Sequence, residues 1–387
     1  MPISVTNPAQ SALQRILVRD IEVDGEQLNL STSELFQVRI QYNENSHDVA
    51  VITTQLTKAQ ISRFVNKPIS FSFGRRSGSA DFYGYVVAIN PNRGYRDDTI
   101  VDIRCLGPTW VMQYGNPRFS INETVPSQFG AVVNNSALAA QVDSHPYRFP
   151  ALACTNGSDW EYLQYLSHLV GYVIYNYQGM VRLVNPIRVL TETPIYRTYL
   201  KGDDVLDNTR ELLDWDATTE SLSLRENMPP VFGYLDAASA RVSESATDPR
   251  PRFDSRTLVK SREMAQVYRE AWDRRIDFWN NTANARIQGD AKVYPGMNVA
   301  IKLSGLRGRR NDYDGIWLVR TVSHSITHNA FQTLLGLARS SSLTPVNADA
   351  SWFWSTARGG PDLQWDEQEQ RWRSRWVGVD VVNAPLL

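Results

Sequence analysis

The chain has 387 residues, of which 42% are hydrophobic and 21% charged, and its formal net charge is −1. This length and composition predict a globular protein of two to four domains with real hydrophobic cores. The near-neutral charge excludes a global field that would draw the chain to nucleic acid or to an anionic membrane. The N-terminal sequence MPISVTNPAQSALQ lacks the regions of a signal peptide, and no run of about 18 apolar residues is present to span a bilayer, so we expect folding in a cytoplasm.

Residues 13–110 are rich in predicted strands. Turn residues separate segments in which β-branched and aromatic residues are frequent, and the near-regular spacing favours a barrel or sandwich. A short helix is expected over Thr57–Val65, plugging one end. The predicted strands are Ile16–Val23, Leu35–Tyr42, Val49–Leu56, Ile69–Phe73, Phe82–Ile89 and Ile100–Cys105.

Residues 111–195 change to a helical period. A helix is predicted to start near Glu123 and to run to about Ala140. A second helix is predicted to open at Ser158, because Ser158 and Glu161 have the spacing of a capping box and Trp160 begins an apolar face. Gly171 ends this helix, and a hairpin over Tyr172–Tyr175 and Met180–Val184 follows. We interpret Trp160 as a structural core residue.

Residues 196–340 contain a predicted strand over Ala217–Arg225, a polar loop or interface arm over 238–255, and a helix of about 20 residues around Met264–Trp279. A strand near residue 286, a Pro295-Gly296 turn, and strands over Met297–Leu303, Gly315–Ser325 and Phe331–Ala338 complete the segment. Strand-rich residues before and after a smaller helical segment hint at an internal duplication.

Residues 341–387 form an extension with five of the chain's eleven tryptophans. Leu363–Trp365 and Arg371–Trp376 flank a polar stretch, which indicates a hairpin. Aromatic residues beside arginine are typical of interface hot spots, whereas spaced tryptophans also stack on sugar rings, so partner contact and glycan binding both stay open. The candidate interface residues are Trp352, Trp354, Trp365, Trp372, Trp376, Arg371 and Arg373.

No catalytic constellation, cofactor motif or metal spacing is evident. His324 and His328 are four apart on a predicted, partly exposed strand, which separates them by roughly 13 Å. Asp203-Asp204 and the pair Asp214/Asp216 are interpreted as solvated turns. The stretch from Gly305 to Gly308 lacks the Lys-Ser/Thr of a phosphate-binding loop. Cys105 and Cys154 match no zinc or disulfide pattern, so both are expected to be buried, reduced and structural.

Three motifs give the sequence a family resemblance. Ser158-x-Trp160-Glu161-x-Leu163-x-x-Leu166, followed by Gly171-Tyr172 and Gly179, resembles the best-marked signature of phage tail hub proteins. Phe82-Tyr83-Gly84-Tyr85-Val86 is similar to their first barrel. Gly289-Asp290, Pro295-Gly296 and Asp314–Val319, with His324 on the pattern's His-like position, are similar to their closing strands.

This resemblance to baseplate hubs, late-control tail proteins and the N-terminal part of type VI spike proteins covers about residues 16–340. It implies a mainly β (α+β) chain: a first hub barrel over 1–110, a small α+β domain over 111–195 and a second barrel with a helix over 196–340. The resemblance implies nothing about the Trp-rich extension over 341–387. The implied function is a structural, non-enzymatic virion protein, a homotrimeric tail hub made in the host cytoplasm. Its implied partners are the tail tube or distal tail protein and the tail-tip or spike protein, with DNA only as passing cargo. The alternative is a tail-tip glycan-binding or cell-wall-degrading protein.

Overall fold

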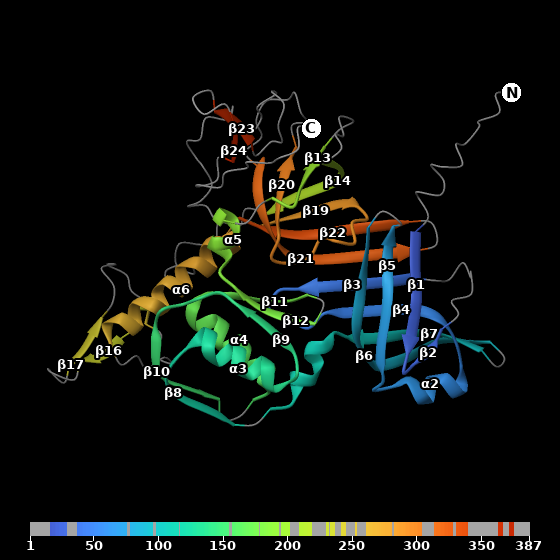
Figure 1. Ribbon diagram of the computed structural model, residues 1–387, viewed down its shortest axis with the longest axis horizontal. Helices are drawn as coiled ribbons and strands as arrows, with labels where there is room; N and C mark the ends of the chain where they lie inside the picture. The colour runs from blue at the N-terminus through green and yellow to red at the C-terminus, as the bar shows by residue number, and fades with distance from the viewer. Residues whose placement is uncertain are drawn as a thin grey trace.

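The computed structural model describes most of the chain between residues 16 and 339 and a short hairpin near the C-terminus (Figure 1). The described residues are 16–28, 37–75, 78–95, 98–115, 117–154, 157–177, 179–192, 195–201, 209–218, 230–231, 233–236, 241–244, 252–253, 261–280, 282–303, 313–327, 330–339, 363–366 and 371–374. The chain is mainly β with a few helices, as the sequence predicts. No helix among these residues is long and apolar enough to cross a membrane.

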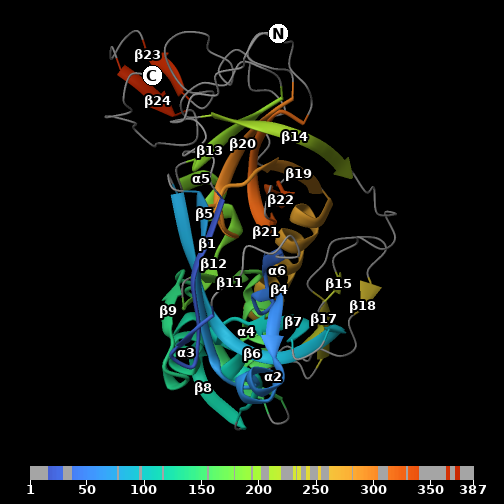
Figure 2. The same cartoon turned by 90° about the vertical axis from the view of Figure 1, so that its right-hand side faces the viewer.

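All six strands predicted for the first segment are present, and together with the short strand β2 they form one bent sheet in the order β2-β1-β5-β6-β7-β4-β3. The strands are β1 (Ile16–Val23), β2 (Glu26–Gln27), β3 (Gln37–Asn43), β4 (Val49–Thr57), β5 (Pro68–Arg75), β6 (Gly78–Tyr95) and β7 (Asp98–Leu106). In Figure 1, β1 and β5 cross the direction of β3 and β4, so the sheet folds over itself into two layers. Figure 2 shows β1 and β5 side by side from another direction.

The long strand β6 makes the corner of this sheet. Its first half pairs with β5 and its second half with β7, and the register shifts between Val86 and Ala88 and again between Pro91 and Arg93. Bulges of this kind bend a strand, which lets β6 pass from one layer into the other. Alternate side chains along each strand then face the space between the layers, where Ile52, Phe71 and Phe82 are buried.

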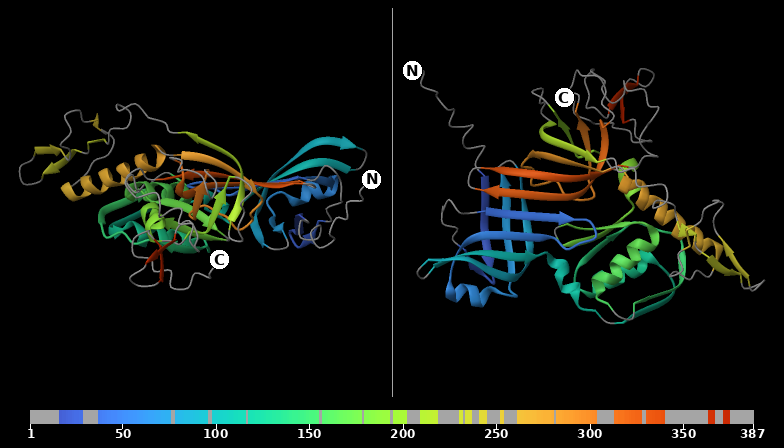
Figure 3. Two further views of the ribbon diagram at one scale, coloured as in Figure 1. Left: turned by 90° about the horizontal axis from the view of Figure 1, so that it is seen from above. Right: turned by 180° about the vertical axis from the view of Figure 1, so that it is seen from behind.

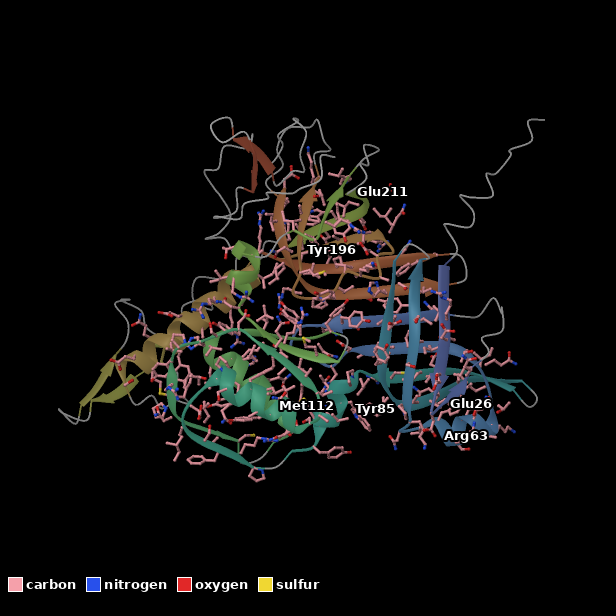
Figure 4. All side chains as sticks on the ribbon, in the orientation of Figure 1. Glu26, Arg63, Tyr85, Met112, Tyr196 and Glu211 are labelled. Carbon is pink, nitrogen blue, oxygen red and sulfur yellow. The ribbon has the colours of Figure 1, made fainter. Side chains whose placement is uncertain are left out.

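Helix α2 (Lys58–Phe64) covers one end of the bent sheet, as predicted. Thr57 is its N-cap, and the side chains of Thr57 and Gln60 form a capping box with the backbone. Phe64 is buried in the core, and on the exposed side Arg63 makes an ion pair with Glu26 of β2 (Figure 4).

The last part of the chain forms a closed barrel of six strands. The circuit runs β21-β20-β13-β14-β19-β22 and returns to β21 through the β21–β22 pairing. All neighbours are antiparallel except that β13 is parallel to both β14 and β20. The strands are β13 (Arg197–Leu200), β14 (Thr209–Thr218), β19 (Thr282–Gln288), β20 (Asn298–Lys302), β21 (Gly315–Thr327) and β22 (Phe331–Ala338).

The barrel and the bent sheet share a strand pairing and a hydrophobic core. The second half of β21, from Thr321 to Thr327, pairs with β3, so the two units are one continuous sheet of thirteen strands. At the point where β21 switches partner, Arg320 is bulged out between Val319 and Thr321. One buried cluster includes Phe73 and Ile40 of the bent sheet and Trp317 and Leu335 of the barrel. The two units are therefore packed together rather than joined by a linker.

Residues 108–192 form a small α+β unit that lies between the bent sheet and the barrel in the sequence. Helices α3 and α4 pack together above a two-stranded β8–β10 ribbon and a three-stranded sheet in the order β11-β12-β9. The elements are the 3-10 helix η1 (Pro108–Gln113), β8 (Arg118–Thr124), α3 (Val125–Asn135), β9 (Ala139–Val142), β10 (Arg148–Cys154), α4 (Asp159–Val170), β11 (Val173–Tyr177), β12 (Met180–Val184) and α5 (Pro186–Glu192).

Helix α6 (Arg262–Asn280) belongs to this unit by packing, although it follows β14 in the sequence. Met264 and Tyr268 are buried against α3 and α4, whereas Phe278 near its C-terminal end packs with Ile316 and Leu318 of the barrel. Figure 3 shows α6 running along the small unit toward the barrel. Gly171, which ends α4, lies close against Ala271 of α6. A Cβ added at Gly171 would lie only 2.7 Å from the Ala271 backbone.

Three predictions about these elements and the cysteines need correction. Helix α3 ends at Asn135 and not near Ala140, because the chain turns at Ala137, which has a positive φ, and enters β9. The strand expected over Ala217–Arg225 stays a prediction, since residues 217–218 are the end of β14 and residues 219–225 lie outside the described part. Short strands, β17 (Arg241–Glu244) and β18 (Arg252–Phe253), occur where a polar loop was expected. Cys105 and Cys154 are both free, but only Cys105 is buried, since Cys154 is partly exposed.

Candidate functional site

The four described histidines lie in different elements and do not form a catalytic group. Burial lowers the pKa of His47 and of His168 to about 4, and that of His145 is also lowered. The His47 ring packs at a tilt of 34° against Trp160, with ring centroids 4.6 Å apart, and its Nδ1 lies 2.8 Å from Thr109 Oγ1. Each of these imidazoles is neutral at pH 7 and a weak base, which does not suit general acid–base catalysis.

His324 is fully buried, which corrects the expectation of a partly exposed strand residue. Its Nδ1 lies 2.9 Å from Thr333 Oγ1, and the rings of Tyr42, Phe73 and Phe331 surround it. Burial lowers the pKa of His324 to about 3, so the ring is neutral. Its place at the β3–β21 pairing makes it a core residue of the joint between the sheet and the barrel; His328 lies outside the described residues.

The carboxylates singled out in the sequence do not form a pair in a cleft. Asp214 and Asp216 lie in strand β14, with Trp215 between them, so the expected solvated turn is wrong, although both residues are exposed. Asp203, Asp204 and the stretch from Gly305 to Gly308 lie outside the described residues. Within the described part of the chain, no three His, Cys, Asp or Glu side chains gather in a way that could hold a metal ion.

The C-terminal candidate interface is described only as a backbone hairpin. Strands β23 (Leu363–Asp366) and β24 (Arg371–Ser374) are antiparallel, which confirms the predicted hairpin, and Trp365 is opposite Trp372 in register. Arg371 and Arg373 lie on β24. Trp352, Trp354 and Trp376 lie outside the described residues. Whether these seven residues contact a partner stays a prediction.

The structure instead brings together polar residues at the turn between β3 and β4, which the sequence did not single out. Arg320, bulged out of β21, makes an ion pair with Glu44, and its Nε donates to Glu44 Oε1 at 2.7 Å. Burial opposes the charge of Arg320, but the pKa of Arg320 is raised overall because Glu44 stabilises its charged form. This pair fixes the turn to the barrel.

Asn45, the next residue of the turn, fixes it to the small α+β unit. Its backbone N–H donates to the Ile174 carbonyl at 2.9 Å, and its side-chain oxygen accepts the Ile174 N–H at 2.9 Å. Its carbonyl accepts a bond from the Gln164 side chain at 2.7 Å. Asn45 has a φ of +52°, a conformation that Asn tolerates better than most residues. We call residues 44–48 the junction turn, because they contact all three units.

Asp48 ends the junction turn inside the protein. It is 3% exposed, and its Oδ2 accepts a bond of 2.6 Å from the Asn176 amide of β11. Burial raises the pKa of Asp48 well above its ordinary value, although the bond from Asn176 acts in the opposite direction. The hydrogen bond between Asp48 and Asn176 is therefore a buried polar contact at a position where apolar packing is more usual.

An exposed apolar surface lies on β8 and beside it. Tyr114, Phe119 and Ile121 are 77%, 68% and 67% exposed, and Tyr165 of α4 is also exposed. Phe119 and Ile121 alternate on one face of β8 and are opposite Ala153 and Ala151 of β10. Exposed apolar side chains that gather in this way mark surfaces for protein contact.

The fold matches solved structures of tail proteins. The tail protein from Neisseria meningitidis MC58 superposes with a TM-score of 0.57 at 11% identity, over 84% of this chain and 96% of that one. The 43 kDa tail protein of prophage MuSo2 from Shewanella oneidensis gives 0.56 at 11% identity, over 84% and 98%. The chain has the fold of these tail proteins.

The tail-protein fold is also that of a type VI secretion component. The Escherichia coli c3393 protein, which is similar in structure to the T4 tail proteins gp27 and gp5, superposes with a TM-score of 0.54 at 8% identity, over 84% of this chain and 78% of that one. No protein-family model and no curated protein sequence matches the chain. The resemblance stated from the motifs is thus confirmed at the level of the fold.

The junction turn is the part of this site that the sequence did not predict. Glu44, Asn45 and Asp48 occur in the stretch NENSHD, which in a sequence has the composition of an ordinary polar turn. Their partners, Arg320, Ile174 and Asn176, are more than a hundred residues away. The only available signal was an acidic residue before an apolar strand, which is too common to identify a buried contact.

Proposed function

We propose that the chain is a structural hub protein of a phage tail or a related injection system, linking the tail tube to the tail tip or spike. The observation that carries this proposal is the extent of the fold match. Two tail proteins are covered over 96% and 98% of their length, and 84% of this chain takes part in each match, so the likeness extends beyond any one of the three units. A role in a virion tail, after synthesis in the host cytoplasm, follows from the proposal.

The internal organisation fits a ring. Each chain contributes two β units, the bent sheet and the barrel, held side by side by the β3–β21 pairing and a common core. Three chains around an axis would place six such units in a ring that matches a sixfold tube, and closed symmetry covers sheet edges that would otherwise stay open. A homotrimer around a central channel, with DNA as passing cargo, is the assembly that we propose.

A non-enzymatic role fits the described chemistry. The described histidines have lowered pKa values and lie in separate elements. By contrast, the exposed apolar residues of β8 suit contact with other proteins of an assembly.

The test is the mass of the assembled protein together with its place in a particle. We expect native mass spectrometry and light scattering to give three chains per complex, and electron microscopy to show a ring with a central opening. Antibody labelling of particles should place the protein where the tube meets the tip. A chain that stays monomeric both in isolation and when extracted from particles, or that digests cell-wall sugars, would contradict the proposal.

A further inference from the structure

A pocket with a positively charged lining lies where the small α+β unit, helix α6 and the barrel meet. Its charged and titratable lining residues are His168 of α4, Arg274 and Arg275 of α6, Arg320 of β21 and Glu44 of the junction turn. Its volume is about 60 Å³, which is room for about two water molecules, and it is partly open to solvent. A small ion can therefore reach it from solution.

The described lining residues carry more positive than negative charge. Three guanidinium groups share the pocket with one carboxylate, that of Glu44. His168 adds no charge at pH 7, because burial and then the charge of Arg275 lower its pKa to about 4. Arg274 has a second carboxylate near it, but that of Glu270 is 3.6 Å away and half exposed, so solvent screens the pair. The excess in the lining is therefore about two positive charges.

Two of these arginines keep N–H groups that the protein does not use. Arg320 donates to Glu44 through Nε and Nη2, and its Nη1 makes no bond to any described residue. Arg274 donates from Nη1 to the Val170 carbonyl at 2.8 Å, and its Nε makes no bond within the described part of the chain. The side chains of Arg320 and Arg274 are 22% and 21% exposed, so solvent reaches both. These donors suit an acceptor that enters from outside.

The third arginine, Arg275, is held in a position that disfavours its charge. Burial lowers the pKa of the Arg275 guanidinium, and the negative charge of Glu44 acts in the opposite direction. Glu44 is also the ion-pair partner of Arg320. One carboxylate therefore serves two partly buried guanidinium groups, and a further anion in the pocket would stabilise both.

We propose that this pocket binds one phosphate group through the guanidinium groups of Arg274, Arg275 and Arg320. The planar fork of arginine matches phosphate oxygens and can donate two parallel hydrogen bonds to them. A phosphate group carries about −1.5 to −2 charges at pH 7, which matches the excess of the lining better than chloride or a carboxylate does. The bound group would connect α6 to strand β21 of the barrel. This inference does not depend on the proposed role in a tail.

The experiment is a titration of the full chain with inorganic phosphate at constant ionic strength. Calorimetry should give one site per chain, and Tm should rise by about 3 °C once phosphate exceeds its Kd a hundredfold. Chloride should give no such rise. Phosphate also stabilises proteins through exclusion from their surface, but that effect does not saturate, whereas binding to the pocket does. Tighter binding of glycerol 3-phosphate than of inorganic phosphate would identify a phosphate ester as the ligand, and weaker binding would identify the free ion.

Substitutions in the lining test which residues hold the phosphate. Arg275→Gln should bind phosphate about tenfold or more weakly, and Arg275→Lys should lose less, because lysine keeps the charge without the fork. Arg104→Gln, which removes an exposed arginine of β7, is the matched control and should bind as the wild type does. If Arg275→Gln does not fold, Arg274→Gln should show the same weakening.

Two results overturn the proposal. In the first, phosphate gives the wild type neither saturable heat nor a saturable rise in Tm, which would mean that water and Glu44 are sufficient for the three arginines. In the second, the wild type, Arg275→Gln and Arg274→Gln bind phosphate equally, which would place the binding elsewhere on the chain.

Discussion

At the scale of single residues, His324 shows how a buried position sets a pH dependence. Burial lowers the pKa of its folded state to about 3, whereas an unfolded histidine has a pKa of about 6.5. Below pH 6.5 the unfolded state therefore binds a proton that the folded state does not, so the free energy of unfolding falls as the pH falls from about 6.5 to 3. Above pH 6.5 the residue contributes no pH dependence.

The measurement is the free energy of unfolding of the wild type and of His324→Gln at pH 7 and pH 5. Gln keeps an acceptor for the Thr333 hydroxyl but does not titrate. The loss of stability between the two pH values should be about 2 kcal/mol smaller in the variant. His47 and His168 titrate in both proteins, so their contributions cancel in this comparison. Equal losses would mean that His324 gains a proton without unfolding.

Gly171 and Gly179 allow a test of close packing that separates backbone conformation from contact. Both have a positive φ, +68° and +78°, but a Cβ at Gly171 would meet the Ala271 backbone at 2.7 Å, whereas nothing lies within 4 Å at Gly179. Gly179→Ala should cost about 1 kcal/mol for its left-handed conformation alone. Gly171→Ala should cost about 3 kcal/mol or more, because α4 and α6 must also move apart. Similar losses in denaturant unfolding would show that this helix contact is loose.

Contacts of single residues were also the feature of the structure that the sequence predicted least well. The capping residues Thr57 and Ser158 could be identified, since a cap depends on neighbours three positions away. Glu44 and Asp48 could not, because their burial is created by partners from other units of the fold. His324 had the right position in a family pattern but the wrong exposure, since strand alternation says which residues share a face and not what covers that face.

At the scale of elements, helix α4 was predicted in full. It runs from Asp159 to Val170 with the capping box of Ser158 and Glu161 and with Gly171 in the left-handed conformation at its end. Trp160 is 4% exposed, and it packs beside His47 and within the core formed by α3 and α4. Helix α4 could be predicted because its N-cap, its apolar periodicity and the glycine that ends it are all local signals in the sequence.

Substitutions on α4 should separate its buried and exposed faces. Trp160→Ala should lower the free energy of unfolding by about 3–5 kcal/mol because it empties a large buried site. Ser158→Ala should cost about 1 kcal/mol through loss of the cap. Tyr165→Ala, on the exposed side of the same helix, is the control and should change stability by less than about 1 kcal/mol. A Trp160→Ala protein with unchanged stability and a lost binding activity would make Trp160 a functional residue instead.

Elements with weak local signals were the ones placed wrongly. The end of α3 was overestimated because Ala137 to Ala140 have good helix propensity, while the pairing of β9 with β12 that overrides it is tertiary. Strand β14 was missed because Asp214 and Asp216 suggest a turn; in the barrel they are exposed positions of a strand whose alternate residue, Trp215, packs inward. Polar outward residues are ordinary in a strand with one buried face.

At the scale of the whole molecule, local sequence patterns could not predict how the bent sheet joins the barrel. Pairing of β3 with β21 brings together residues such as Ile40 and His324, which are far apart in the sequence. Strand periodicity predicts two strand-rich segments, and the family resemblance implies two β units. Neither predicts that one strand, β21, pairs with strands of both units. The bulge at Arg320 and its ion pair with Glu44 are what allow β21 to change partner at that point.

The C-terminal extension belongs to this largest scale, since its five tryptophans lie in a stretch too short to bury them in a core of its own. We expect residues 351–376 to dock on a neighbouring chain or a tail-tip partner, with tryptophans as anchors and arginines at the rim. Deleting residues 345–387 should leave the thermal unfolding of the rest of the protein nearly unchanged, because the described barrel and bent sheet close their cores without it. Attachment of a partner or of a neighbouring chain should weaken.

A full-length variant separates the loss of the tryptophan side chains from the loss of the whole extension. It carries serine in place of Trp352, Trp354, Trp365, Trp372 and Trp376. It should weaken attachment as much as the deletion does, since hot-spot aromatic side chains carry most of the binding energy of an interface. Pull-down and particle assembly assays measure the effect. Normal assembly with lost adsorption to cell-wall sugars would assign the tryptophans to glycan binding, because the rings would then stack on sugars and not on protein. Normal assembly and normal adsorption would reject both roles for the extension.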